Sequence, residues 1–196
     1  MKRVLASGVA AALIALLLAA AGANADGRLH EFRWDIVDLS FGATAGGQSV
    51  STDPATGDTV TLSGSGQFET EEREADGGGT FVHRSASGEV LGEGIYRVTA
   101  LRSWKPLSGS LVGTGLVDGI GDLREARSGI AKLGLTAYVD GAVVAHGVIT
   151  IYCALPGAPA GSIEGVALHV RTADGATADF TEVEPDNGPT VFHVLQ

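Results

Sequence analysis

Apolar and polar residues alternate with a period of two along most of this chain, and no segment keeps a helical period for any length. The clearest alternation runs from Ile130 to Cys153, on both sides of Asp140-Gly141. Asp-Gly between two β-rich segments is typical of a two-residue hairpin turn, because both turn positions require a positive φ. We therefore expect two long antiparallel strands here, with the rest of the chain organised around them.

A two-residue turn also predicts the register of this hairpin. Val139 would pair with Ala142, and Leu135 would then lie opposite His146. The more apolar face, which we expect to cover the core, would carry Ala131, Leu133, Leu135, Ala137, Val139, Val144, His146, Val148, Thr150 and Tyr152. The opposite face is more mixed and would carry Ile149 and Ile151.

Further strands are predicted on both sides of the hairpin by alternation or by short β-rich runs. They cover residues 29–39, 58–69, 80–84, 90–104, 111–117, 165–171, 176–183 and 190–195. Residues 41–57 read as a loop with a short strand around 48–51, and residues 70–79 as an acidic loop. Only residues 118–129 have a helical feature, a capping box of Asp122 and Glu125 that allows one or two turns.

Two details within these strands indicate curvature. Gly64 and Gly66 fall on the predicted inward face of their strand, where missing side chains allow close approach of another backbone. At a second Asp-Gly, residues 174–175, a two-residue turn would leave Phe180 facing away from the core. That conflict predicts a longer loop or a bulge. Together the patterns predict an all-β fold, an antiparallel single-domain β-barrel or tight β-sandwich of about nine or ten strands with at most one short helical turn.

The first 25 residues are typical of a secretory signal peptide. Lys2 and Arg3 precede an apolar run, which ends in the small-x-small sequence Ala23-Asn24-Ala25. We expect cleavage before Asp26, with cleavage after Ala23 as the alternative. Residues 26–196 would then form a single all-β domain that is secreted or extracytoplasmic, with no membrane attachment after cleavage.

The charge of the remaining chain limits its partners. Removing Lys2 and Arg3 leaves eleven of the 13 basic residues against 23 acidic residues, a net charge of −12. Such a balance argues against nucleic acid and anionic membranes as partners. No protein partner is indicated. The single cysteine excludes an internal disulfide, and Cys153 is predicted to be a buried, unreactive thiol.

No pattern of residues predicts catalysis, a metal or a cofactor. The chain has no nucleophile elbow, phosphate-binding loop or dinucleotide fingerprint. Its five histidines are not spaced as metal ligands on a strand or a helix, and no nearby cysteine or carboxylate completes a site. We therefore predict no catalytic residue, no metal and no organic cofactor.

Three side chains are candidates for ligand binding. His146 lies on the predicted apolar face, where it is either a hydrogen-bonded core residue or the polar group of a small-ligand cavity. Tyr152 lies on the same predicted face, about 20 Å from His146 along a strand, so any partner of His146 must come from another strand. His83 is either a solvated edge residue or a ligand contact.

Several short motifs resemble a group of exported bacterial β-proteins of unassigned function. They are Gly64-Ser-Gly-Gln-Phe68, Gly77-Gly-Gly-Thr-Phe-Val-His83, Gly94-Ile-Tyr-Arg-Val-Thr99 with Ser103-Trp104, Tyr152-Cys153 and Phe192-His193-Val194. The resemblance implies a fold and a compartment but no activity. The predicted architecture is also similar to the small barrels of the allene oxide cyclase and dirigent type, from which no residue carries over.

Two functions follow as hypotheses. The first is an exported, non-catalytic β-barrel module that binds or scaffolds, because strand patterns are strong and catalytic motifs are missing. The alternative is a dirigent- or cyclase-like barrel that binds or isomerises a small apolar molecule. The two differ in whether the interior of the barrel is filled or hollow.

Overall fold

The computed structural model describes residues 31–40, 42–182 and 188–195, and within them the chain is all-β. None of the described residues belongs to a helix long and apolar enough to cross a membrane. All strand pairs are antiparallel. The strands are β1 (Glu31–Asp38), β2 (Thr44–Ala45), β3 (Ser49–Thr52), β4 (Thr59–Glu69), β5 (Ala75–Arg84), β6 (Val90–Leu107), β7 (Ala126–Val139), β8 (Ala142–Cys153), β9 (Gly165–Thr172), β10 (Thr177–Glu182) and β11 (Thr190–Val194).

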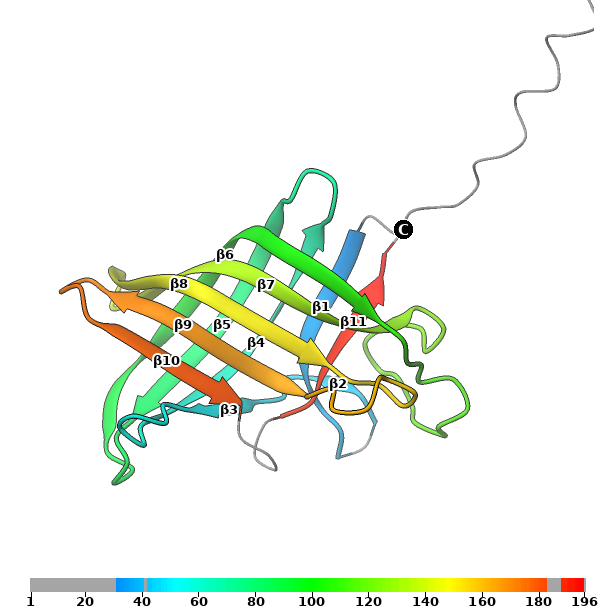
Figure 1. The fold of residues 1–196 in the computed structure, drawn as a ribbon, viewed down its shortest axis with the longest axis horizontal. Helices are drawn as coiled ribbons and strands as arrows, with labels where there is room; N and C mark the ends of the chain where they lie inside the picture. Colours follow the sequence, from blue (N-terminus) through cyan, green and yellow to red (C-terminus); the bar gives the residue numbers. More distant parts are fainter. Residues whose placement is uncertain (1–30, 41, 183–187, 196) are drawn as a thin grey trace, which may run out of the picture.

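Backbone pairing closes the sheet on itself. The long strands β4 to β7 are neighbours in order, and β4 and β7 each have two partners on their other side. β4 pairs first with β3 and then with β1, whereas β7 pairs first with β11 and then with β8. β8, β9, β10 and β3 complete one ring, and β1 and β11 complete the other. The predicted single-domain β-barrel is confirmed, with β8, β9 and β10 crossing in front of β4 and β5 in Figure 1.

The central hairpin has the predicted turn but a different register. Val139 pairs with Ala142, as expected, but Val144 has no partner because the pairing shifts between Ala137 and Tyr138. This β-bulge places Leu135 opposite Gly147 instead of His146. The inward face of β8 therefore carries Ala145, Ile149, Ile151 and Cys153, all of them buried.

Three further predictions need correction. Residues 111–117 are a loop and not a strand, because Gly113 and Gly115 adopt φ of +83° and +78° and turn the chain. The acidic loop ends at residue 74, since Gly77 and Gly79 pair with glycines of β4 inside β5. The strand predicted over residues 90–104 is longer, since β6 continues through Pro106 to Leu107 at the end of its ladder with β7.

The loop between β9 and β10 is longer than two residues, as expected, since Arg171 pairs with Thr177 and Phe180 with the inward-facing Leu168. The candidate for a helical turn, residues 118–129, does not form one. Residues 118–125 contain turns, with a hydrogen bond of 2.9 Å from the backbone N–H of Arg124 to the carboxylate of Asp122, and residues 126–129 already belong to β7.

The interior is packed solid in the half of the barrel that β1 and β11 close. Four aromatic rings contact one another there, with centroid separations between 4.8 and 5.9 Å: Phe32, Phe68, Trp104 and Phe192. Trp34 and Ile36 are buried beside them in the same core. Large aromatic side chains thus fill this half, and the other half is different.

Candidate functional site

An apolar cavity of about 400 Å³ opens into the half of the barrel that β8, β9 and β10 close. Its walls come from seven strands, β4 to β10, together with their ends. The lining residues are Val60, Leu62, Phe81, His83, Leu91, Gly92, Tyr96, Leu135, Ala137, Val139, Val144, Ala145, Leu168, Val170, Thr172, Ala178 and Phe180. A cavity of this size suits a small organic ligand.

The cavity exists because the inward positions at this end carry small side chains. Ala137, Ala145 and Ala178 occupy three of them, on three different strands. Gly92 occupies another, and a Cβ atom added to it would have no heavy atom within 4 Å. The alternation of side chains along each strand directs these residues inward. Their side chains are too small to contact one another across the barrel, so a cavity remains.

The β-bulges shape the rim of the cavity. Val144, the unpaired residue of β8, lines it next to Ala145. A second register shift lies between His83 and Arg84 of β5, opposite Leu91 of β6. Leu91 also lines the cavity, although it is 52% exposed. Both bulges thus add an apolar side chain to the rim beyond what strict alternation would place there.

Tyr96 lies at the boundary between the cavity and the packed half. Its hydroxyl donates a hydrogen bond of 3.0 Å to the carbonyl oxygen of Ser63. Gly64 leaves room for this contact, because a Cβ atom there would lie 2.3 Å from the Tyr96 hydroxyl. Burial raises the pKa of Tyr96, so its phenol remains protonated and presents a closed, neutral wall to the cavity.

His83 contributes an imidazole to the cavity wall. Its Nε2 atom lies 3.4 Å from the carboxylate of Asp58, without forming a hydrogen bond. The ring packs edge-on against Phe180, with centroids 5.5 Å apart. The contacts with Asp58 and Phe180 hold the ring in place. Because the side chain is still 33% exposed, one edge of the ring remains accessible to a ligand.

Among the described residues, no lysine, arginine, aspartate or glutamate lines the cavity. Its polar groups are the imidazole of His83 and the hydroxyls of Tyr96 and Thr172. A charged ligand would be desolvated there without a partner of opposite charge, at a cost of several kcal/mol. The walls therefore suit an uncharged, mainly apolar molecule with one hydrogen-bonding group.

The three residues predicted for ligand binding do not come together. His83 lines the cavity, whereas His146 is exposed on the outside of the barrel, where its Nδ1 is hydrogen bonded to Thr136 Oγ1 at 3.0 Å. Tyr152 also faces outward, since its neighbours Ile151 and Cys153 are fully buried. The prediction that His146 and Tyr152 lie on the core face is wrong, because the bulge at Val144 reverses the alternation of β8.

Most of the lining residues were not predicted from the sequence to form a site. The alternation of β6 predicts Gly92 and Tyr96 as inward-facing, but nothing in it shows that small residues on several strands meet at one end. Ala137, Ala145 and Ala178 are far apart in sequence, and only the ring closure brings them together. Inward glycine and alanine near strand ends are the signal that could have indicated a hollow interior.

A second polar cluster lies in the other half of the barrel and fastens a loop. His193 of β11 donates from Nε2 to Asp118 at 2.7 Å, and both side chains are buried. Burial alone would raise the pKa of Asp118, but hydrogen bonds from the N–H groups of Ile120 and Gly121, together with His193, lower it overall. This cluster therefore ties the connection between β6 and β7 to the wall.

Asp35 is buried near this cluster and forms an ion pair with Arg33, whose Nε lies 2.8 Å from its carboxylate. Burial raises the pKa of Asp35, and the hydrogen bond from Arg33 opposes that shift. Asp35, Asp118 and His193 come from three distant segments, so no local pattern in the sequence groups them as a cluster.

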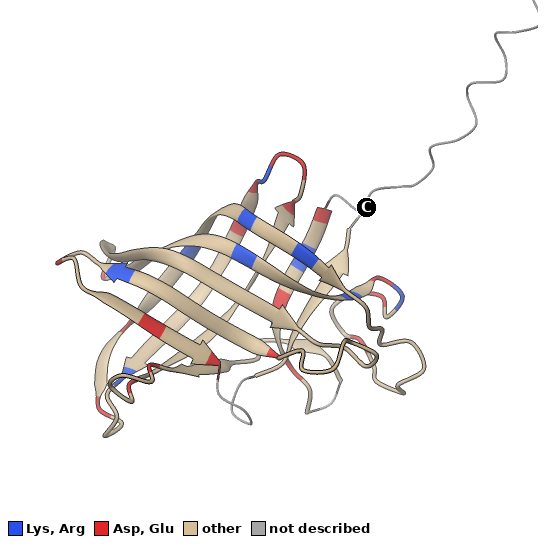
Figure 2. Cartoon of the chain, in the orientation of Figure 1, with Lys and Arg blue, Asp and Glu red and all other residues tan. Residues whose placement is uncertain are grey.

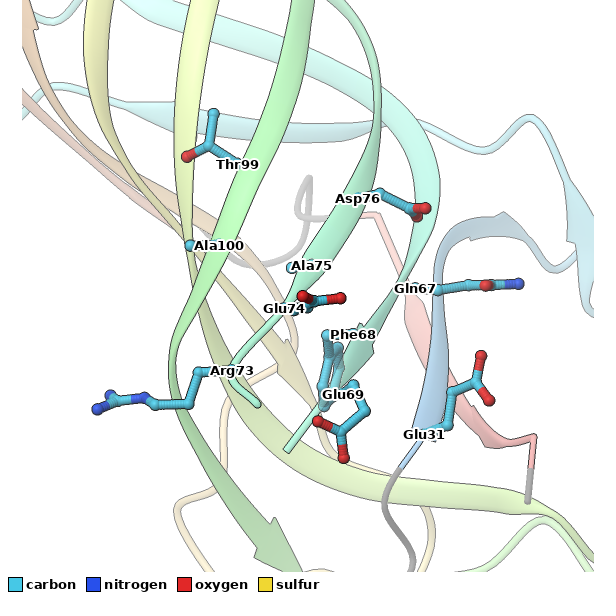
Figure 3. Close-up of a pocket in the computed structure, with 10 residues that line it drawn as sticks. All are labelled: Glu31, Gln67, Phe68, Glu69, Arg73, Glu74, Ala75, Asp76, Thr99 and Ala100. Atoms are coloured by element: carbon cyan, nitrogen blue, oxygen red, sulfur yellow. The ribbon is translucent and has the colours of Figure 1, made fainter. Parts of the chain in front are cut away.

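An open, more polar pocket lies at the end of β4 and β5 (Figure 3). Its residues include Glu31, Glu69, Glu74 and Asp76. Figure 3 shows the guanidinium group of Arg73 directed away from these carboxylates, and that group donates to the carbonyl oxygen of Arg102. Among the residues that the structure describes, no three histidine, cysteine, aspartate or glutamate side chains are grouped so that they could hold a metal ion.

The cysteine has the predicted environment. Cys153 is fully buried, and desolvation, together with the negative charge of Glu164, raises the pKa of its thiol well above the usual value. A thiol in this state is a poor nucleophile.

Comparisons with protein-family models, with curated protein sequences and with solved structures found no match for this chain.

Proposed function

We propose that this protein is a non-catalytic binding module that holds an uncharged, mainly apolar small molecule in the open half of its barrel. The observation that carries the proposal is a cavity of about 400 Å³ with apolar walls and no charged side chain. Transfer of apolar groups from water into such walls contributes about 0.8 kcal/mol per CH₂ group. A ligand with roughly ten such groups therefore gains about 8 kcal/mol, which corresponds to micromolar affinity before the costs of association are subtracted.

The polar groups of the cavity give the ligand an orientation. His83 lies on one wall, held between Asp58 and Phe180; its Nε2 is buried against Asp58, so Nδ1 is the ring nitrogen left for a ligand. A ligand hydroxyl or carbonyl group could pair with it while the rest of the molecule contacts valine, leucine and phenylalanine side chains. One fixed polar contact in an apolar cavity is the usual arrangement for specific small-ligand binding.

The same imidazole supports the alternative, an isomerase- or cyclase-like reaction on an apolar molecule. A histidine in a cavity can move a proton, and His83 is the imidazole that the described residues contribute to this wall. Binding is preferred because Tyr96, the other titratable group of the cavity, stays protonated and so supplies no base. Mass spectrometry of a compound before and after incubation with the protein separates the two, since only the alternative changes its structure.

Filling the cavity tests the proposal. Gly92→Leu places a side chain into empty space, since no atom lies near the added Cβ, and Glu93→Leu is the matched control on the outward face. The probe is N-phenyl-1-naphthylamine, a neutral compound whose fluorescence rises in apolar surroundings. We expect Gly92→Leu to bind it at least about tenfold more weakly, which corresponds to about 1.4 kcal/mol, and Glu93→Leu to match the wild type. Equal binding by all three proteins, or no binding by the wild type, would contradict the proposal.

We also propose that the protein acts outside the cytoplasm, on the basis of the amino-terminal sequence described above. Sequencing the amino terminus of protein recovered from the producing cell should identify Asp26 as the first residue. Protein that retains Met1 and the apolar run would contradict export.

A further inference from the structure

The outer surface of β6 to β9 carries a group of exposed cations that differs from the rest of this acidic chain. We call it the cationic face; it consists of Arg97, Arg102, Lys105, Lys132 and Arg171. Strands β6 to β9 together contain a single acidic residue, Glu93, out of 23 in the whole chain. Figure 2 shows basic positions along these strands and acidic positions mainly in loops and on other strands.

The cations of this face have no ion-pair partner among the residues that the structure describes. Among the described residues, none of the five has a carboxylate oxygen within ion-pair distance, whereas Arg33 and Arg127 both do. Clustered like charges repel one another, and pairing with local acids would be the simple way to relieve that repulsion. The lack of such ion pairs in a chain with an excess of acidic residues indicates that the face is complementary to an anionic partner outside the molecule.

The strand register aligns part of this face into one row. Arg97 pairs with Thr136, Thr136 with His146, and His146 with Arg171, so four polar side chains lie side by side across β6 to β9. Neighbours in such a row are about 5 Å apart, within reach of one bound group. The hydrogen bond between Thr136 and His146 fixes the centre of the row, and the two arginines flank it. The register thus places one arginine on each side of a hydroxyl and an imidazole, and side chains that turn toward this centre can hold a carboxylate between them.

A second cationic position follows along the same face. Lys132 lies opposite Ser103 on β6, and it is four residues from Thr136 along β7, or about 13 Å. Lys105 lies further along, opposite Ile130. The charges are therefore widely spaced in a line, whereas duplex DNA carries one charge per about 1.7 Å of its axis.

Aromatic rings border the same surface. Arg97 lies over the ring of Tyr138, with its guanidinium carbon 5.9 Å from the ring centroid. Tyr138 and Tyr152 both face outward, on β7 and β8, near opposite ends of the hairpin. An exposed tyrosine ring beside a charged group can contact the apolar face of a sugar ring while the cation contacts its carboxylate.

We propose that the cationic face binds an extended acidic polysaccharide, a chain in which carboxylate-bearing sugars alternate with neutral ones. One carboxylate binds between Arg97 and Arg171, and the polymer continues along the strands toward Lys132 and Lys105. The widely spaced cations favour this partner over nucleic acid, and the long strands β6 and β7 give the face the length that an extended chain needs. Repulsion from the remaining carboxylates of the protein is screened beyond about 10 Å at 0.1 M salt, whereas contacts at the face are local.

The test compares two variants that remove the same charge. Arg97→Gln/Arg171→Gln alters the row, and Arg84→Gln/Arg124→Gln removes two exposed cations elsewhere. Binding to hyaluronate, a polymer of alternating charged and neutral sugars, is measured at 0.1 M salt, with neutral dextran and single-stranded DNA as comparison polymers. We expect the wild type and the second variant to bind hyaluronate alike, and the first variant to bind at least about tenfold more weakly, because charge-assisted contacts are lost.

Three results would overturn this inference: no binding of hyaluronate by the wild type, an equal loss in both variants, or tighter binding of DNA than of hyaluronate. Circular dichroism of both variants confirms that the barrel is intact, since all four positions are exposed. Binding of the neutral fluorescent probe should be the same in both variants and the wild type. This readout separates the outer face from the cavity, so either proposal can fail without the other.

Discussion

Tyr96 on β6 hydrogen bonds to the carbonyl oxygen of Ser63 on β4, across the intervening strand β5. The phenol can reach β4 because Gly64 has no side chain at the point of contact. This bridge separates a half of the barrel filled with aromatic rings from a half that is hollow. The interior of the barrel is thus neither wholly filled nor wholly hollow.

The first prediction concerns this bridge. Tyr96→Phe keeps the ring but leaves the Ser63 carbonyl without its donor, so the free energy of unfolding should fall by about 1–2 kcal/mol. Tyr138→Phe, on the outer face, is the control and should change it by less than about 0.5 kcal/mol. Urea denaturation measures both. Equal stability of the two variants would show that the hydrogen bond does not contribute to the fold.

The second prediction concerns His146. Because its side chain is exposed, His146→Ala should lower the free energy of unfolding by less than about 1 kcal/mol. Ile149→Ala, on the inward face of the same strand, should lower it by about 2–5 kcal/mol, since it leaves a cavity in the core. If the costs of the two substitutions were reversed, the bulge at Val144 would be absent and the simple hairpin register would be right.

The hairpin also shows how far the sequence could predict the fold. Asp140-Gly141 correctly indicates the turn, and the alternation of β7 correctly predicts Leu133 and Leu135 as core residues. The error arises at Val143-Val144-Ala145, where three consecutive apolar residues hide the point at which the alternation changes phase. A bulge inserted in such a run leaves no trace in the pattern of polar and apolar residues.

The cavity was harder to predict than the strands. Periodicity indicates which residues of one strand face inward, but the volume that remains depends on which strands close the ring. Phe180 illustrates the point, since its inward direction depends on a three-residue loop in place of a two-residue turn. His83 belongs to the cavity for the same reason, although a histidine on a short strand reads equally well as a solvated edge residue.

The third prediction concerns the buried pair of Asp118 and His193. The lowered pKa of Asp118 means that its ionised form stabilises the folded chain above about pH 3.8, and that this stabilisation is lost as the pH falls through the folded-state pKa. Asp118→Asn should therefore lower the free energy of unfolding by about 1–3 kcal/mol at pH 7. The difference from the wild type should shrink as the pH is lowered below about 3.8.

Thermal or urea unfolding between pH 3 and pH 7 checks this dependence. Asp122→Asn, in an exposed turn of the same connection, serves as the control and should show a smaller and flatter difference. A cost of Asp118→Asn that stays constant or grows toward pH 3 would contradict the assigned role.

The fourth prediction concerns the polar contact in the cavity. His83→Leu removes the ring nitrogen and adds apolar surface, so it should weaken binding of 1-naphthol by about 1–2 kcal/mol relative to naphthalene. The comparison of two ligands with the same ring system cancels changes in cavity shape. If His83→Leu changed the affinities for both compounds equally, His83 would not be the group that orients the ligand.

Methyl NMR of the wild-type protein during titration with N-phenyl-1-naphthylamine reports where the molecule binds and is the decisive measurement for a ligand site in the barrel. We expect chemical-shift changes at Val60, Leu135 and Leu168, which line the cavity, and none at Ile36 or Val191, which are buried in the packed half. Changes confined to exposed residues such as Val112 and Val117, or no saturable change at all, would contradict a ligand site inside the barrel.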